Sequence, residues 1–162
     1  MKRLICLILA MLLLSGCGVF GERIKDPVTF YYIRSDYQKD MESVIASEMR
    51  ESSGHRDDLP YLLALYSMGP SKEGLQSPFP PTTRIIPTEH TAAGIVLSLS
   101  DIPESMTDAE YTLASACLAL TCMELTNASQ ITVISGGRSV TINTENLMLF
   151  ETGHERQLEE MK

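Results

Sequence analysis

The segment that begins at Thr107 constrains the fold most, because its helical pattern is apolar almost all round. Thr107 and Glu110 have the T-x-x-E spacing of a capping box, which starts a helix. The apolar side chains that follow are Leu113, Ala114, Ala116, Cys117, Leu118, Ala119, Leu120 and Met123. We expect Asn127 to end this helix. A helix that is apolar on nearly every side is typical of a buried element, so we expect it deep against a sheet.

Runs of β-branched and aromatic residues predict strands on both sides of this helix. The predicted strands cover residues 28–33, 43–50, 83–88, 94–100, 130–135 and 139–143. Pro87 restricts its own strand to a sheet edge or a bulge, because proline has no N–H to donate. The pair Gly136-Gly137 predicts a tight hairpin turn, because both residues can adopt positive φ.

A shorter helix is predicted from Asp57 to Met68. Either Asp57 or Asp58 can cap it, and Pro60 is tolerated in the first turn. Gly69 then supplies a left-handed terminator, and Pro70 prevents continuation. The elements therefore predict an α+β fold: a mostly antiparallel sheet of about five or six strands with two main helices packed on it.

The N-terminus has the features of a secretory signal. A positive start, Lys2 and Arg3, precedes an apolar run of about ten residues, too short to span a bilayer. Leu14-Ser15-Gly16-Cys17 follows and resembles the bacterial lipobox, which implies lipidation of Cys17 and cleavage before it. The alternative is an ordinary signal peptide with a chance cysteine. Two acyl chains suffice for stable anchoring, so we expect the chain at the extracytoplasmic face of the cell membrane.

The chain then divides into four parts. Residues 1–16 are the predicted signal peptide, 17–26 a lipid-anchored tether, 27–143 a single domain, and 144–162 an acidic C-terminal tail expected to be partly disordered. The whole chain of 162 residues has 13 basic and 21 acidic side chains, a net charge of −8. This balance argues against nucleic acid as a partner, because nucleic-acid binding requires a basic face.

The sequence contains no recognisable catalytic or metal-binding set of residues, so we expect a protein that is not an enzyme and needs no cofactor or metal. The three histidines, His55, His90 and His154, are far apart and have no metal-type partner nearby, so we expect them at the surface. No nucleophile motif is present. Cys117 and Cys122 are predicted to be small buried hydrophobes, because five helical residues set them too far apart for a disulfide.

Several short motifs follow one another along the chain. The first helix leads to Tyr66-x-x-Gly69-Pro70, and the alternating residues 95–100, the helix with Leu118-Ala119-Leu120-Thr121 and the strand at 131–134 come later. Between them lie the remaining motif residues, for which a structural role is expected: Leu75, Ser77, Pro78, Pro80 and Thr83. This order of motifs resembles the GerMN domain, named from a spore germination and sporulation protein of endospore-forming bacteria. The chain departs from the family at Pro81, where a glycine is usual before the threonine, and has length for one domain copy only.

The resemblance implies a non-catalytic domain, held outside the membrane, that acts in sporulation, spore germination or cell-envelope assembly. Its partners would be other envelope or sporulation proteins; the sequence does not indicate an oligomeric state. The alternative that stays open is a lipoprotein that binds cell-wall material or a small ligand, or an envelope enzyme. The non-catalytic docking domain predicts an exposed apolar patch or an open sheet edge. The ligand-binding protein or enzyme predicts a concave polar pocket.

Overall fold

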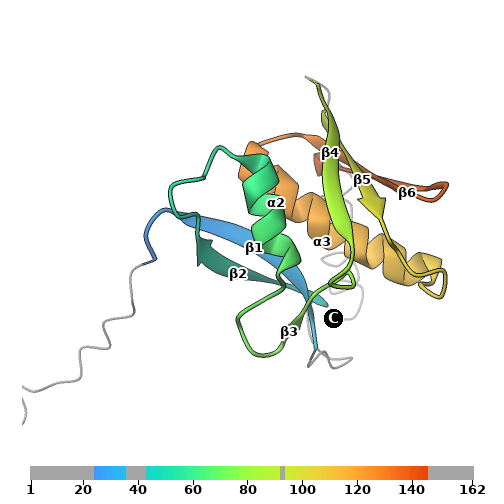
Figure 1. Cartoon of the computed structure of the whole chain (residues 1–162), viewed down its shortest axis with the longest axis horizontal. Coiled ribbons are helices and arrows are strands. Elements are labelled where there is room, and N and C mark those ends of the chain that lie inside the picture. The colour runs from blue at the N-terminus through green and yellow to red at the C-terminus, as the bar shows by residue number, and fades with distance from the viewer. Residues whose placement is uncertain (1–23, 36–42, 92–93, 146–162) are drawn as a thin grey trace, which may run out of the picture.

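The computed structural model describes residues 24–35, 43–91 and 94–145. Cys17, the predicted signal peptide and residues 146–162 of the predicted tail lie outside this part of the chain. The elements, shown in Figure 1, are β1 (Pro27–Arg34), β2 (Ile45–Glu51), α2 (Leu59–Ser67), β3 (Leu75–Gln76), β4 (Arg84–Thr91), β5 (Gly94–Ser100), α3 (Asp108–Thr126), β6 (Gln130–Ser135) and β7 (Arg138–Asn143). Among the described residues, neither helix combines the length and the hydropathy needed to cross a membrane.

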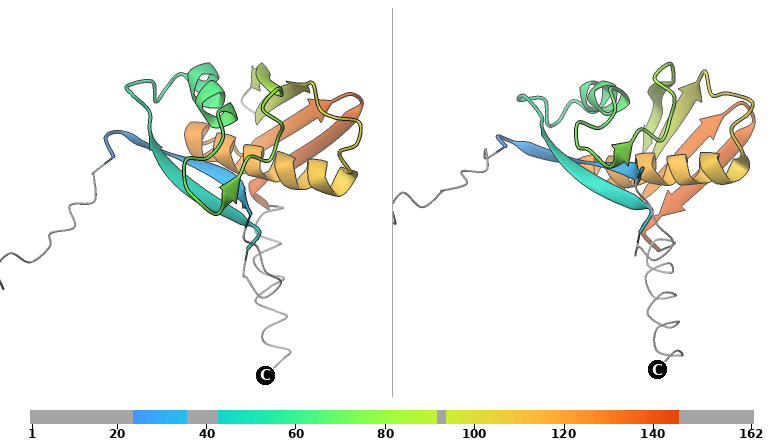
Figure 2. Two further views of the ribbon diagram at one scale, coloured as in Figure 1. Left: turned by 60° about the horizontal axis from the view of Figure 1, so that its bottom comes forward. Right: turned by 90° about the horizontal axis from the view of Figure 1, so that it is seen from below.

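The strands form two sheets on either side of α3 (Figure 2). One sheet has the order β2-β1-β3 and the other the order β4-β5-β6-β7. All pairs are antiparallel except β5 and β6, which are parallel and are joined in sequence by α3. The predicted α+β class and the mostly antiparallel pairing are therefore confirmed. The division into two sheets was not predicted.

Helix α3 explains the division. The hydroxyl oxygen of Thr121 in α3 accepts the backbone N–H of Tyr31 in β1 at 2.9 Å. That N–H is thus bonded to a helix where a neighbouring strand would otherwise accept it. Further along β1, on the side opposite β2, the two residues of β3 pair with Ile33 and Arg34.

The core lies between the helices and the two sheets. Alternate residues of β1, Val28, Phe30 and Tyr32, are buried on one face of the strand. The rings of Tyr32 and Tyr66 stack with centroids 5.0 Å apart. The Tyr32 hydroxyl donates to the carbonyl of Tyr66, and the Tyr66 hydroxyl donates to the carbonyl of Tyr31. Burial raises the pKa of the Tyr32 hydroxyl to about 12 and that of Tyr66 well above its ordinary range.

The two helices begin and end where the sequence predicts. The Asp58 side chain accepts the N–H of Tyr61 at 3.0 Å, with Pro60 in the first turn of α2. The capping box of Thr107 and Glu110 is complete in α3, and Asn127 ends that helix in the left-handed conformation. The burial of α3 is less complete than predicted: it is closed toward the two sheets, whereas its opposite side is only partly covered.

The remaining strand predictions are also confirmed. Strand β4 lies at the edge of its sheet, and its register with β5 shifts between Pro87 and Glu89. Gly136 and Gly137 turn the chain between β6 and β7 with φ values of +53° and +86°. Strand β2 confirms the extended assignment of residues 43–50, although it begins at Ile45.

Candidate functional site

The predicted motif residues lie along the connection that leads from α2 through β3 to β4. At its start, the backbone carbonyl of Gly69 accepts a hydrogen bond from the Arg50 guanidinium at 2.9 Å. The Glu48 carboxylate accepts the N–H of Ser71, just beyond Pro70, at 3.0 Å. The turn at Gly69 and Pro70 is therefore held on β2 by two side chains of opposite charge.

The later motif residues shape the rest of this connection. Leu75, in the short strand β3, pairs with Arg34 of β1. The Ser77 hydroxyl donates to the carbonyl of Phe79 at 2.9 Å. The carbonyl of Pro80 accepts the N–H of Thr83 at 2.9 Å, and the Thr83 side chain is buried. Pro78 is buried beside Phe79. These contacts fit the structural role that we predict for the motif, and they do not gather its side chains around a common point.

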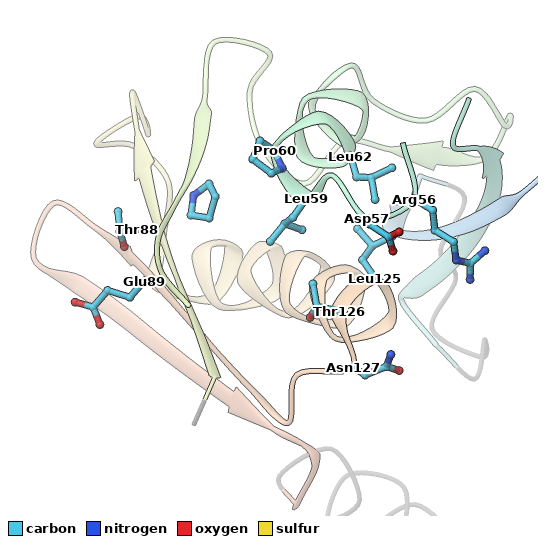
Figure 3. A pocket seen from close by; sticks show the side chains of 11 residues that line it. Arg56, Asp57, Leu59, Pro60, Leu62, Thr88, Glu89, Leu125, Thr126 and Asn127 are labelled. Atoms are coloured by element: carbon cyan, nitrogen blue, oxygen red, sulfur yellow. The ribbon is translucent and has the colours of Figure 1, made fainter. Parts of the chain in front are cut away.

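A cleft of about 620 Å³ lies elsewhere, between the start of α2, the middle of β4 and the end of α3 (Figure 3). Its lining residues are Arg56, Asp57, Leu59, Pro60, Leu62, Pro87, Thr88, Glu89, Leu125, Thr126 and Asn127. Three segments that are far apart in the sequence thus meet here. Sequence reasoning singled out Pro87, Asp57 and Asn127 for their backbone roles, but it did not bring them together.

The cleft combines apolar walls with an acidic rim. The walls come from leucine and proline side chains of α2, β4 and α3, and exposed Asp57 and Glu89 stand at the rim. The one basic lining side chain, Arg56, is already engaged: its guanidinium lies 3.2 Å from the Asp26 carboxylate and donates to the carbonyl of Pro27 at 3.0 Å. The end of α3, which has no basic residue in its last turn, adds further negative potential.

The reactive groups of the core are closed to solvent. Cys117 and Cys122 are free thiols with 0% exposure. Burial raises the pKa of each to about 12, which keeps them protonated. In the described residues no three histidine, cysteine or acidic side chains are grouped as metal ligands. His55 is half exposed and stacks on Tyr61 with ring centroids 4.1 Å apart.

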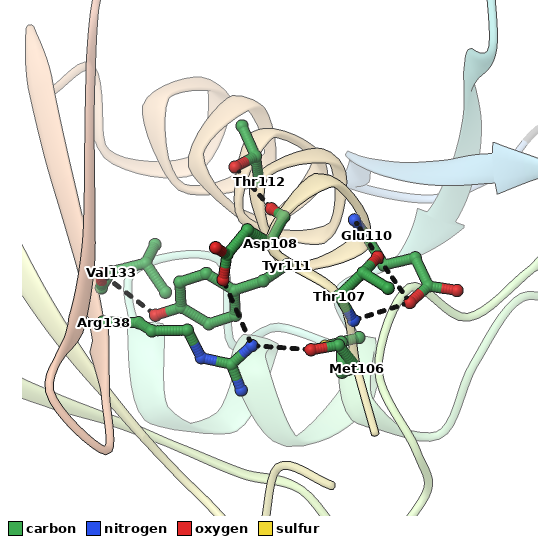
Figure 4. Close-up of polar contacts among 8 residues, drawn as sticks. All are labelled: Met106, Thr107, Asp108, Glu110, Tyr111, Thr112, Val133 and Arg138. Carbon is green, nitrogen blue, oxygen red and sulfur yellow. Dashed lines mark hydrogen bonds and ion pairs between the residues drawn. The ribbon is translucent and has the colours of Figure 1, made fainter. Parts of the chain in front are cut away.

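A second polar cluster, around Arg138, joins β7 to the start of α3 (Figure 4). The Arg138 guanidinium lies over the Tyr111 ring, 4.6 Å from its centroid, and donates to the carbonyl of Met106 at 2.8 Å. The Tyr111 hydroxyl donates to the carbonyl of Val133 at 3.2 Å. Most partners in this cluster are backbone carbonyls, so its evident effect is to fasten the hairpin to the helix.

Comparison with known proteins finds solved structures that are similar to this chain at low identity. No described protein family matches the chain, and no curated protein matches it. The chain is similar to the tandem GerMN domains of the sporulation protein GerM from Bacillus subtilis, with 20% identity over 76% of this chain and 43% of that one, at a TM-score of 0.48. It is also similar to a structure titled "Putative Lipoprotein from Clostridium perfringens", with 12% identity over 74% of this chain and 89% of that one, at a TM-score of 0.45. The first of these carries the domain that the motifs of this sequence resemble.

Proposed function

We propose that this protein is a lipid-anchored, extracytoplasmic lipoprotein whose domain docks other envelope or sporulation proteins without catalysis. The motif order along residues 62–134 supports the sporulation setting, and the lipobox-like sequence at Cys17 supports the anchor. The observation that carries the docking role is the cleft beside β4, because it adjoins a strand that lies at the edge of its sheet among the described strands.

The cleft suits an extended protein segment. Strand β4 pairs with β5 alone among the described strands, so backbone groups along its other edge, apart from Pro87, which has no N–H, can bond a further strand. Leu59 and Leu125 of the walls would receive an apolar side chain of that segment. The carboxylates of Asp57 and Glu89 would favour basic side chains on either side of it.

Photo-crosslinking in living cells tests the docking role. A photoreactive residue at exposed Thr88 of the full chain should capture an extracytoplasmic protein, and Glu89→Arg should reduce the yield several-fold. Glu51→Arg is the matched control, because it reverses an exposed glutamate on a strand of the other sheet. Equal capture from Thr141, in strand β7 at the far edge of the β4 sheet, would refute the docking site.

The same experiment distinguishes protein docking from the alternative function, which is ligand binding or catalysis in the envelope. A volume of about 620 Å³ is within the range of small-molecule sites, so the cleft could also hold cell-wall fragments or a small ligand. Copurification of such material, without a protein crosslink from Thr88, would replace docking by ligand binding or by an enzyme of the envelope.

The anchor has its own test. Cys17→Ala removes the thiol that a lipobox would lipidate, so the variant should leave the membrane fraction or accumulate as an uncleaved precursor. A Cys117→Ala variant controls for the loss of a thiol, because that cysteine is buried in the core. Correct processing and membrane retention of Cys17→Ala would refute lipidation at this position.

A further inference from the structure

Helix α3 has one apolar side that the described elements leave partly open. The residues on this side, which we call the outer stripe, are Ala109, Leu113, Ala116, Leu120 and Met123. Ala109 is exposed and the other four are half-buried, whereas the opposite side of the helix includes Ala114, Leu118 and Cys122 at 0% exposure. In both views of Figure 2, α2 lies above α3, and no helix of the described residues lies below it.

The spacing within the outer stripe is that of a coiled-coil seam. Successive members are four, three, four and three residues apart, which is the alternation of the a and d positions of a heptad repeat. Leucine alternates with alanine through the middle of the stripe, so large side chains stand between shallow positions. Such a surface accepts the knobs of a second helix in its holes, which a flat or irregular partner would leave empty.

The charges beside the outer stripe indicate what kind of helix fits. Helix α3 contains three acidic residues, Asp108, Glu110 and Glu124, and no basic one. Asp108 lies 4.0 Å from the Arg138 guanidinium. The Glu110 carboxylate accepts two hydrogen bonds within the capping box, so the negative charge beside the outer stripe comes mainly from Glu124. Glu124 is exposed and directly follows Met123, at a position that flanks the seam. The end of α3 lacks a basic residue, so its unpaired carbonyl groups add to this negative potential.

These charges disfavour a second copy of the chain as the occupant. An antiparallel pair of α3 helices would place Glu124 near the acidic start of the partner helix, and a parallel pair would place it near another Glu124. The net charge of −8 on each chain opposes both arrangements. A helix with lysine or arginine beside its own apolar seam would instead meet opposite charges along its length.

We propose that the outer stripe docks an amphipathic helix of a partner protein, apolar along one seam and basic at the positions beside it. This surface lies on the partly open side of α3, with Met123 at its border with the core, and is separate from the cleft at β4. Binding at the outer stripe can therefore be tested independently of binding at the cleft.

Binding of two synthetic helices tests this proposal. Both probes are 21-residue peptides with leucine and alanine at the seam positions, one with lysine and the other with glutamate at the flanking positions. The lysine probe should bind the full chain at least tenfold more tightly than the glutamate probe. Leu120→Glu should weaken the lysine probe at least tenfold, because it replaces an apolar side chain of the seam with a charged one. The added carboxylate would by itself strengthen non-specific attraction of the cationic probe, so weaker binding cannot result from the change of charge. Thr141→Glu adds the same charge at an exposed position of strand β7, outside the outer stripe, and should leave the affinity unchanged.

A charge reversal supplies a second variant that spares the apolar seam. Glu124→Lys should weaken the lysine probe and strengthen the glutamate probe, each about threefold or more. Unchanged affinities in Leu120→Glu would overturn the proposal. It would also be overturned if the full chain sedimented as a dimer that Leu120→Glu dissociates, since a second copy would then occupy the stripe. A chain ending at Glu145 that alone bound the probe would overturn it as well, by showing that residues 146–162 occupy the stripe.

Discussion

At the scale of single residues, Gly94 occupies a more crowded backbone position than Gly54, Gly69, Gly136 or Gly137. A Cβ atom added there would lie 2.3 Å from the carbonyl oxygen of Gln130, at the point where β5 meets β6. Because the obstacle is backbone, it can yield only if the parallel pairing of the two strands is displaced. We predict that Gly94→Ala lowers the free energy of unfolding by about 3 kcal/mol or more, measured by urea denaturation.

Gly54→Ala is the matched control for this prediction. Gly54 also has positive φ, at +83°, but an added Cβ would have nothing within 4 Å. Its cost should be only the backbone strain of the left-handed conformation, about 1 kcal/mol. Equal losses in the two variants would show that strain and not the contact with Gln130 governs Gly94.

At the scale of elements, the first turn of α3 depends on Thr107. The Thr107 hydroxyl accepts the N–H of Glu110 at 3.3 Å, and its loss leaves a helix donor without that partner. Thr107→Ala should therefore destabilise the protein by about 1 kcal/mol in thermal or urea unfolding. Thr112→Ala, in the same helix, should have almost no effect, because Thr112 bonds only the carbonyl of Asp108 and alanine favours helix. A larger loss for Thr112→Ala than for Thr107→Ala would contradict this account.

The other half of the capping box makes α3 sensitive to acid. The backbone N–H of Thr107, and then its hydroxyl, lower the pKa of Glu110 by bonding its carboxylate, each at 2.8 Å. Because this pKa is lower in the folded state, the contribution is complete above the unfolded-state pKa of about 4.3. It is lost as the pH falls through the lower folded-state value.

The variant Glu110→Gln measures how much of the stability lost in acid comes from protonation of Glu110. Glutamine accepts similar hydrogen bonds but does not titrate, so the stability difference between wild type and variant should be largest near pH 7 and shrink below about pH 4. Urea unfolding at pH 7, 5, 4 and 3 measures this difference. A difference that stays constant over this range would show that the carboxylate does not titrate in the capping box.

At the scale of the whole molecule, Thr121 links α3 to the sheet of β1. Its buried hydroxyl accepts the Tyr31 N–H and donates to the carbonyl of Cys117, both at 2.9 Å. Thr121→Val keeps the shape but leaves the Tyr31 N–H unpaired, so it should cost about 1–3 kcal/mol. Hydrogen exchange at the Tyr31 amide should accelerate at the same time.

Thr121→Ser tests whether the hydroxyl or the methyl group matters. Serine retains the bond to Tyr31, so slow exchange of that amide should persist in this variant. Rapid exchange at Tyr31 in Thr121→Ser, or slow exchange in Thr121→Val, would show that packing around α3 protects the strand edge.

Local features of the sequence were sufficient to predict every element except the two-residue strand β3. Capping by Asp58 and Thr107, the stop at Asn127 and the turn at Gly136-Gly137 each depend on neighbours within a few residues, so the chain specifies them directly. Pro87 lacks an N–H wherever it stands, and this alone predicted an edge or a bulge; the structure has both. The α+β class follows from the order of these elements.

Contacts between distant residues decided the rest. The sequence does not reveal that the Tyr31 N–H bonds to Thr121, 90 residues away, where α3 lies at the edge of β1 and the strands separate into two sheets. The cleft likewise requires Leu59, Pro87 and Leu125 to meet, and no periodicity relates them. The nearly uniform apolar surface of α3 also conceals its outer stripe, because only packing determines which side of such a helix stays partly open.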